Sequence, residues 1–180
     1  MHDQAGDPLL AGLAEGRDEA FAALYDRYGR PLFRVAWTLL RSRQDAEDAV
    51  QDVFLGLFRS RAVLGRVVNL RAYLFSALRR AATGLAARKE VPLRPPPDGP
   101  GAIDPDLSDW LERGLAALPR EQREVLTLKI DGELTFEEVG AVLGVSPSTA
   151  ASRYRYALEK LRGHFHEEYH ASRPAPAGPS

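Results

Sequence analysis

The chain has 180 residues, enough for one domain of ordinary size or two small ones. Its formal net charge is only -1, and hydrophobic residues make up 44%, so the chain can build a core. It contains no cysteine, which excludes disulfides, thiol nucleophiles and thiolate zinc sites. No apolar run approaches the ~20 residues that a membrane helix needs, and the N-terminus lacks the features of a signal peptide. We therefore expect a cytoplasmic protein that does not enter a membrane.

The near-neutral total conceals a segregation of charge along the chain. Residues 1–52 carry a net charge of -4 and residues 90–180 one of -5. The segment between them has no Asp or Glu and eight basic residues: Arg59, Arg61, Arg66, Arg71, Arg79, Arg80, Arg88 and Lys89. A basic block between acidic flanks predicts a local surface that binds an anionic partner.

A proline-rich segment divides the sequence into two parts. Residues 91–105 hold six prolines, which favour an extended and semi-stiff backbone. We therefore predict a first domain at residues 7–89, a linker at 90–105 and a second domain at 106–169. Residues 170–180 have little to bury and are expected to form a disordered tail.

Apolar residues recur at helical spacing through the first domain. Asp18 is expected to cap one helix, Pro31 to stand at the first position of the next, and Asn69 to cap a later one. No segment alternates long enough to form a sheet, so the fold class is predicted to be all-α. The expected inner faces are Phe21, Leu24, Tyr25 and Tyr28; Leu32, Val35, Ala36 and Leu39; Ala46, Ala49, Val50, Val53, Phe54 and Leu57; and Leu70, Tyr73, Leu74, Ala77, Leu78, Ala81 and Leu85.

The second domain carries the signals of a helix-turn-helix. Gly132 is expected to end one helix as a left-handed residue. Thr135 and Glu138 form a capping box at the start of the next helix, and Gly144 is expected to end it. Ser146 and Pro147 suit the start of a following helix. The second helix of such a pair normally enters the DNA major groove.

The helix that begins at Ser146 has one apolar face and one polar face. Arg can contact guanine edges through two hydrogen bonds, and Ser or Thr can bind phosphates or bases, so the polar face is predicted to read DNA. The alternative is an ordinary helix pair with a solvated polar face. The expected inner residues are Ala150, Tyr154, Ala157, Leu158 and Leu161, and the expected DNA contacts are Ser148, Thr149, Ser152, Arg153, Arg155 and Tyr156.

The basic block interleaves arginines with aromatic residues, a combination that suits single-stranded or distorted nucleic acid. Eight positive charges without a local acid repel one another unless an anionic partner is present. The alternative places Tyr73 in the core and leaves the arginines in solvent. The candidate contacts are Arg59, Arg61, Arg66, Arg71, Tyr73, Arg79, Arg80 and Arg88.

An acidic stripe lies at the start of the third helical pattern. Asp45, Asp48 and Asp52 fall at positions i, i+3 and i+7, and they are expected on one exposed face. Paired carboxylates can perform acid/base catalysis or bind a metal, but no nearby histidine or glycine turn suggests a pocket. A protein partner fits this stripe better, and a merely solubilising face is the alternative.

Taken together, these motifs resemble the small, two-domain extracytoplasmic-function group of bacterial RNA polymerase sigma factors. The similarity covers nearly all of residues 18–163 and keeps the order and spacing of the motifs. It is carried by Phe21, Leu24, Tyr25 and Tyr28; by DAEDAVQDVF (45–54), RAYLF (71–75), LPREQREV (118–125), TFEEV (135–139) and LGVS (143–146); and by Ser152 and Arg153.

The resemblance implies roles for the predicted surfaces. The acidic helix would dock on a coiled coil of the largest polymerase subunit through Asp45, Asp48, Gln51 and Asp52. Residues 59–89 would bind and open the downstream promoter element, while the helix-turn-helix would read the upstream element. Core RNA polymerase and promoter DNA are thus the expected partners of a monomeric chain, and binding of an anti-sigma protein stays open. Members often carry other residues where this chain has Arg80, Gly84, Ala151 and Tyr156.

Three other classes of function are alternatives. A stand-alone regulator would use only the second domain to bind DNA, and an interaction module would resemble a sigma factor with a degenerate DNA surface. An enzyme is the third class, in which His164, His166 and His170 with Glu167 and Glu168 would bind a metal. His164 and His166 point to different helix faces, and no nucleophile elbow, P-loop or HExxH motif occurs. We therefore expect no catalytic residues, no metal site and no cofactor.

Overall fold

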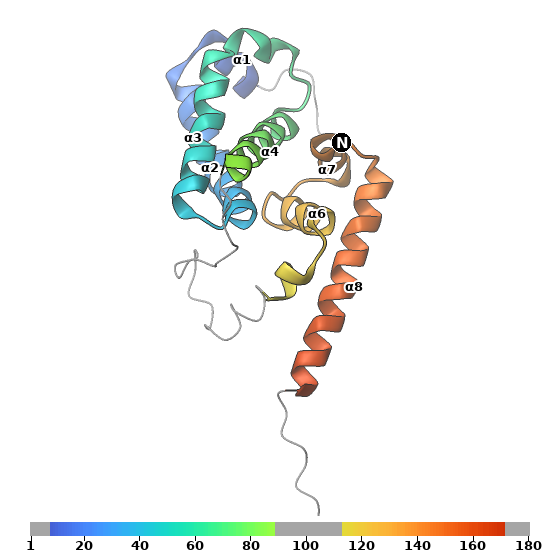
Figure 1. Ribbon diagram of the computed structural model, residues 1–180. Coiled ribbons are helices and arrows are strands. Elements are labelled where there is room, and N and C mark those ends of the chain that lie inside the picture. Colours follow the sequence, from blue (N-terminus) through green and yellow to red (C-terminus); the bar gives the residue numbers. More distant parts are fainter. Residues whose placement is uncertain (1–7, 89–112, 172–180) are drawn as a thin grey trace, which may run out of the picture.

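The computed structural model describes residues 8–88 and 113–171, and its secondary structure there is helical (Figure 1). The all-α prediction is confirmed. Residues 113–117 also form a helical segment. The elements are α1 (Pro8–Glu15), α2 (Asp18–Leu40), α3 (Arg43–Arg59), the 3-10 helix η1 (Arg61–Arg66), α4 (Leu70–Arg88), α6 (Arg120–Ile130), α7 (Phe136–Leu143) and α8 (Pro147–Ala171).

In the N-terminal half, residues 8–88, helices α2, α3 and α4 pack together around a shared apolar core. Helix α1, which the sequence patterns do not indicate, contacts η1 at one end of this bundle. Leu13 of α1 and Leu64 of η1 are both buried there. The fully buried residues of the bundle include Leu24, Leu32, Ala46, Leu74 and Leu78, all of which lie on predicted inner faces.

Helix α2 is one continuous helix through Pro31, so the predicted start of a new helix at Pro31 is wrong. Asp18 is also a first-turn residue, and Arg17 holds the capping position without a side-chain hydrogen bond. Proline in a helix interior costs about 3 kcal/mol because one backbone hydrogen bond is lost. Leu24, Leu32 and Val35 are all buried along one stripe, and each contributes about 1.5–3 kcal/mol, which outweighs that cost.

Side-chain caps fix the predicted starts of α4 and α7. Asn69 Oδ1 accepts a hydrogen bond of 2.8 Å from the backbone N–H of Ala72. Thr135 Oγ1 accepts from the N–H of Glu138 at 3.2 Å, while Glu138 Oε2 accepts from the N–H of Thr135 at 2.8 Å. Both caps and the capping box are as predicted.

The turn between α7 and α8 is tight. Gly144 ends α7 in the left-handed region with φ 70°, as predicted. A Cβ at Gly140 would lie 2.7 Å from the carbonyl oxygen of Val145, so only glycine allows the turn to lie against α7. Ser146 Oγ then accepts from the N–H of Thr149 at 3.1 Å. These contacts set the angle at which α8 leaves the turn.

Gly132 does not adopt the predicted left-handed conformation. The left-handed residue is its neighbour Glu133, with φ 55°. Gly132 is instead required by packing, because a Cβ there would lie 2.7 Å from the carbonyl oxygen of Leu128. The same Cβ would lie 3.1 Å from the ring of Phe75 in α4, so the chain passes very close to the N-terminal half at this point.

In the C-terminal half, residues 113–171, α8 packs against α6 and α7 and extends beyond them (Figure 1). Ala150, Ala157 and Leu161 are buried as predicted, whereas Leu158 is 39% exposed and does not belong to the inner face. Helix α8 runs to Ala171, so the predicted tail begins within its last turn, and residues 172–180 lie outside the described residues.

Arg123 of α6 connects this helix to the segment before it, residues 115–118. Its guanidinium donates to the carbonyl oxygens of Leu115, Ala116 and Leu118 at 2.9–3.0 Å. Burial lowers the pKa of Arg123, and the positive charge of Arg41 lowers it further. The three carbonyls satisfy donors that would otherwise be costly to bury.

The two halves pack against each other, with α6 and α7 lying against α2 and α4 (Figure 1). One apolar cluster runs through both halves and includes Phe75, Leu128 and Val139. Phe75 lies outside the predicted inner face of α4, yet it is wholly buried. The second half covers it. The predicted linker, residues 90–105, lies outside the described residues.

Polar contacts surround this apolar contact. Arg34 Nη2 donates to the carbonyl oxygen of Asp131 at 3.2 Å, and Thr38 Oγ1 donates to Asp131 Oδ2 at 3.2 Å. Burial raises the pKa of Asp131, while the hydrogen bond from Thr38 and the charge of Arg34 partly oppose this rise. The ionised carboxylate is thus less favourable at this interface than in water.

Replacing Asp131 by asparagine is expected to stabilise the protein at neutral pH. The raised pKa means that the carboxyl favours folding only while it is protonated, and this contribution is lost as pH rises through the raised value. An amide keeps an acceptor for Thr38 without the charge. Urea unfolding at pH 7 should show a higher midpoint for Asp131→Asn. The gain should shrink on acidification, and a lower midpoint at pH 7 would contradict it. Glu137→Gln, an exposed change of equal charge, is the control.

Candidate functional site

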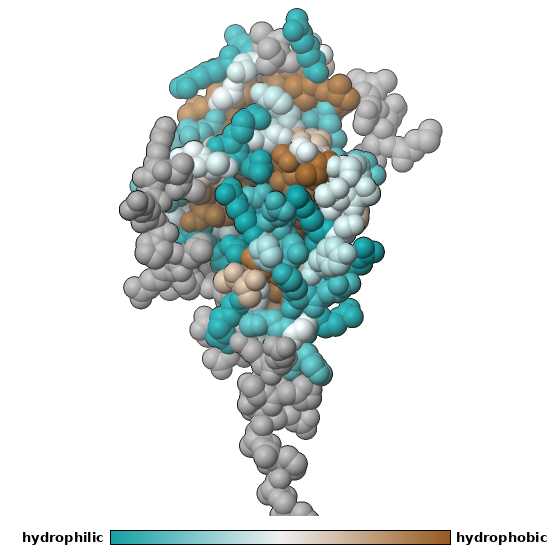
Figure 2. Space-filling model, turned by 45° about the vertical axis from the view of Figure 1, so that its right-hand side comes forward, coloured by the Kyte–Doolittle hydropathy of each residue, from teal (hydrophilic) through white to brown (hydrophobic). Residues whose placement is uncertain are grey.

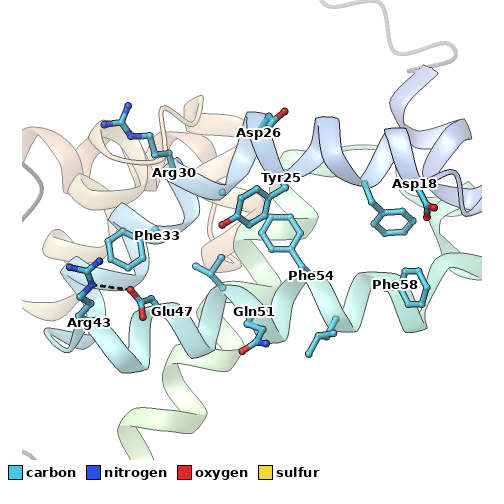
Figure 3. Close-up of a pocket in the computed structure, with 14 residues that line it drawn as sticks. Asp18, Tyr25, Asp26, Arg30, Phe33, Arg43, Glu47, Gln51, Phe54 and Phe58 are labelled. Carbon is cyan, nitrogen blue, oxygen red and sulfur yellow. Dashed lines mark hydrogen bonds and ion pairs between the residues drawn. The ribbon is translucent and has the colours of Figure 1, made fainter.

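A groove of about 880 Å³ lies between α2 and α3 (Figure 3). Aromatic rings line its length. The Tyr25 and Phe54 ring centroids are 5.3 Å apart, and those of Phe21 and Phe58 are also 5.3 Å apart. Phe33 continues the aromatic lining toward the end of the groove near Arg43.

The groove exposes large apolar side chains to solvent. Tyr25 is 62% exposed, Phe58 49% and Leu55 42%. Exposed apolar patches that are contiguous and rimmed by polar groups mark interaction surfaces. The rim is charged with both signs: Asp18, Asp26 and Arg30 lie along it, and Arg43 and Glu47 form an ion pair of 2.9 Å (Figure 3).

One of the four residues that the resemblance assigns to polymerase docking lines the groove, and another lines a cavity between α3 and α4. Asp48, Gln51 and Asp52 are exposed on α3, and Gln51 also lines the groove. Asp45 is only 8% exposed, so the prediction of one exposed acidic face is wrong for this residue. It lies in the first turn of α3, where a carboxylate interacts favourably with the helix dipole.

Sequence reasoning did not find the groove, because it placed Phe21, Tyr25 and Phe54 on the inner faces of their helices. In the structure Leu24 and Tyr28 fill the core, and Tyr25 turns outward. The sequence feature that could have indicated the groove is the width of the apolar stripes on α2 and α3. An apolar stripe wider than one buried face leaves side chains for a second surface.

The predicted nucleic-acid surface of the N-terminal half is divided in the structure. Arg59, Arg61, Arg66 and Arg80 are exposed, and the side chain of Arg88 is outside the description. Arg61 lies over the Phe58 ring at 5.7 Å from its centroid. Tyr73 is half-buried and lines a cavity of about 170 Å³ between α3 and α4, together with Arg80 and Asp52.

Two members of the same predicted set contact the C-terminal half instead. Arg71 Nη1 donates to the carbonyl oxygen of Glu133 at 3.1 Å. Arg79 Nη2 lies 3.3 Å from Glu124 Oε2. The other oxygen of Glu124 accepts from Arg120 Nε at 2.9 Å. The sequence could not show this pairing, because the partners lie far apart along the chain.

The predicted DNA-reading residues gather at the start of α8. Ser148, Arg155 and Tyr156 are exposed, whereas Thr149 and Ser152 are half-buried. Figure 2, which turns the α8 side of the molecule forward, shows a mainly hydrophilic face. Arg153 is less accessible than expected, with a side chain 27% exposed and an ion pair of 2.8 Å to Glu121 of α6.

Other kinds of site find no support within residues 8–88 and 113–171. No group of three or more His, Asp or Glu side chains is placed there to hold a metal ion, and the side chains of residues 167–170 are outside the description. Among the described helices, none is both long and apolar enough to span a membrane.

In comparisons with known proteins, one family model matches the N-terminal half and another matches the C-terminal half. The chain matches Sigma-70 region 2 over residues 24–90 and Sigma-70, region 4 over residues 114–163. It is 32% identical over 175 residues to the ECF RNA polymerase sigma factor SigM of Mycobacterium tuberculosis, covering 89% of this chain and 84% of SigM.

Two solved structures have a similar fold. CnrH in complex with the cytosolic domain of CnrY matches with a TM-score of 0.69 and 26% identity, covering 88% of this chain and 96% of that one. The sigma factor RpoE of Bartonella quintana, in complex with the anti-sigma factor NepR, matches with a TM-score of 0.68 and 23% identity. The latter match covers 82% of this chain and 98% of that one.

Proposed function

The chain belongs to the ECF RNA polymerase sigma factors, and from this membership we propose which of its surfaces perform each step of promoter recognition. A sigma factor directs core RNA polymerase to specific promoters and initiates transcription there. The observation that carries our assignment is the exposed aromatic groove beside the acids of α3, which gives the N-terminal half a ready protein-binding surface.

The groove and the acids together form the proposed polymerase-docking surface. Asp48 and Asp52 supply charge that steers association with a basic helix surface. Tyr25 and Phe58 supply large apolar area, and aromatic residues in desolvated positions commonly carry most of the binding energy. A coiled coil of the largest polymerase subunit is the proposed occupant, since a helix face fits an elongated groove.

The exposed arginines around η1 and α4 are proposed to bind the opened strand of the downstream promoter element. Arg59, Arg61 and Arg66 form the approach, where phosphates are neutralised. Tyr73 and Arg80 line the cavity between α3 and α4, where a base can stack on the aromatic ring.

The start of α8 is proposed to read the upstream element, with Arg153 as the base contact. Arg153 must leave Glu121 to do so. Because Glu121 is 68% exposed, this pair contributes only about 0–1 kcal/mol. A bidentate contact to a guanine is worth about 1–3 kcal/mol, so the exchange favours DNA.

The remaining expectations follow from this assignment. The chain acts as a monomer in the cytoplasm, where polymerase and promoter DNA are found, and the polymerase carries out all the chemistry. An anti-sigma protein is a further proposed partner, because the similar RpoE structure contains one. The test of the whole assignment is to sequence transcripts made by core polymerase with and without the purified chain. New start sites support it, and an unchanged transcript set contradicts it.

Asp48→Arg is expected to weaken binding to core polymerase by at least about 1 kcal/mol, because it reverses a charge that faces the partner. Affinity can be measured by fluorescence anisotropy at low and moderate salt. Glu159→Arg makes the same charge change on exposed α8 and is the control. Equal affinities of the two variants would remove Asp48 from the docking surface.

Leu55→Glu is expected to weaken polymerase binding by about 2 kcal/mol, since it places a charge on the apolar wall of the groove. Leu55 is already 42% exposed, so circular dichroism should show unchanged helicity. Ile130→Glu, at a residue 54% exposed outside the groove, is the matched control. The groove is not the docking site if both variants bind like the wild type.

Arg153→Ala is expected to lower affinity for the cognate promoter by about 1–3 kcal/mol and to relax discrimination at one base pair. Glu121→Gln releases the ion pair but keeps the guanidinium, so it should preserve that discrimination. Binding of the holoenzyme to a library of upstream elements measures both effects. A uniform loss over all sequences would make Arg153 a phosphate contact instead.

A further inference from the structure

The turn between α1 and α2 makes a close contact with the basic segment that follows α3. Helix α1 ends in a Schellman motif, in which the N–H of Gly16 donates to the carbonyl oxygen of Leu13 at 3.1 Å and the N–H of Arg17 to that of Gly12 at 2.9 Å. Gly16 takes the left-handed conformation that this motif needs, with φ 75°. Helix α1 also packs against η1, so the turn lies at the same end of the bundle as the arginines of η1 (Figure 1).

The guanidinium of Arg61 lies directly on this turn. A Cβ at Gly16 would lie 2.8 Å from Arg61 Nη1 and 3.6 Å from Arg61 Cζ. Asparagine can also adopt the left-handed conformation that ends a helix, so the Schellman motif alone does not require glycine. The absence of a Cβ is what allows the arginine side chain to cross the backbone of the turn.

An aromatic ring contacts the same guanidinium. Arg61 Cζ lies 5.7 Å from the centroid of the Phe58 ring. That ring makes an edge-to-face contact with Phe21, with 5.3 Å between the centroids. A cation near an aromatic face is attracted by the quadrupole of the ring. The Phe58 ring and the backbone of Gly16 therefore restrict Arg61 to a defined position before any ligand arrives.

These contacts leave the hydrogen-bond donors of Arg61 for a ligand. A guanidinium has five N–H donors. Within residues 8–88 and 113–171, Arg61 has its ring contact and no hydrogen bond or ion pair. Glu15, the acid next to the turn, is paired instead with Arg17 at 2.9 Å. Arg61 thus combines a fixed position with open donors, which suits an arginine that binds a phosphate through two hydrogen bonds.

We propose that Arg61 is a pre-organised phosphate contact of the strand-binding surface and that Gly16 is its positioning residue. The proposal rests on the proposed function, because it takes the arginines of η1 as strand contacts. Helix α1, which the sequence patterns do not indicate, then has a role in binding: it holds the turn against η1. Ordering a flexible arginine when the strand binds would reduce the affinity by about threefold to tenfold, and the turn avoids this loss.

The first test adds a Cβ to the turn. Gly16→Ala and Gly16→Asn should each weaken binding of the full chain to a fluorescein-labelled oligothymidylate by about threefold to tenfold, because the displaced guanidinium must be ordered again. Asparagine tolerates the left-handed conformation, so Gly16→Asn tests the added Cβ with little backbone strain. Gly163→Ala on α8, where a Cβ would meet nothing within 4 Å, is the control. Unchanged binding by both Gly16 variants would overturn the proposal.

Salt dependence separates the position of Arg61 from its charge. Arg61→Ala removes one cation, so the slope of log affinity against log salt should become shallower by about 0.7. Gly16→Asn keeps that cation and should weaken binding with the slope of the wild type. Arg27→Ala is the matched control for the lost charge, because Arg27 is also exposed and lies 5.3 Å from the centroid of the Tyr28 ring. Equal changes of slope in Arg27→Ala and Arg61→Ala would remove Arg61 as a specific phosphate contact.

A double-mutant cycle tests whether Gly16 acts through Arg61. In the Arg61→Ala background, the side chain that a Cβ would displace is absent. Adding Gly16→Asn to this background should change the strand affinity by less than about twofold. A general distortion of the turn would instead weaken binding equally in both backgrounds, and that result would overturn the positioning role. Thermal unfolding followed by circular dichroism shows whether each variant is folded at the temperature of the binding measurement.

The outcomes distinguish this proposal from the proposed function. Failure of the wild-type chain to bind the strand, or unchanged binding by Arg61→Ala, overturns Arg61 as a strand contact even if the chain directs polymerase to promoters. Conversely, a loss on Gly16→Asn that disappears in the Arg61→Ala background supports the contact and its positioning, even if the chain changes no transcript start site.

Discussion

The packing of α4 against the segment that joins α6 to α7 determines how the two halves of the chain are arranged. Phe75 is fully buried there, and a Cβ at Gly132 would lie 3.1 Å from its ring. Burying one such ring contributes about 1.5–3 kcal/mol, whereas the exposed pair of Arg34 with Glu133 contributes about 0–1 kcal/mol. The apolar contact therefore holds the halves together. Around it, the guanidinium groups of Arg71 and Arg79 donate to Glu133 and Glu124 of the C-terminal half.

Local chemistry was sufficient to predict much of the fold. The caps at Asn69 and Thr135 and the left-handed Gly144 depend on neighbouring atoms, so the sequence near them determines their geometry. Pro31 and Gly132 were misinterpreted because their conformations are set by tertiary packing. The same limit applies to the candidate site. Residue types located the acidic and basic surfaces, but the aromatic groove and the pairing of Arg79 with Glu124 arise only when distant helices meet.

Helix α3 links the two proposed activities of the N-terminal half. Gln51 and Leu55 line the groove on one side, while Asp52 and Val53 line the cavity that α3 shares with Tyr73 and Arg80 of α4. A partner that presses on the groove therefore contacts the same rigid helix that forms a wall of the proposed strand-binding cavity. Docking and strand capture are in this way placed within one helix diameter of each other, about 10 Å.

The tight turn before α8 has a consequence for protein engineering. A Cβ at Gly140 would lie 2.7 Å from the carbonyl oxygen of Val145, so close backbone contacts in the turn, together with the buried Ala150, Ala157 and Leu161, fix the orientation of α8. The outward residues of α8 can thus be exchanged for those of another factor while the helix keeps its tilt. Such chimaeras would carry the proposed promoter-reading surface from one factor to another, provided that they keep glycine at positions 140 and 144 and the buried face of α8.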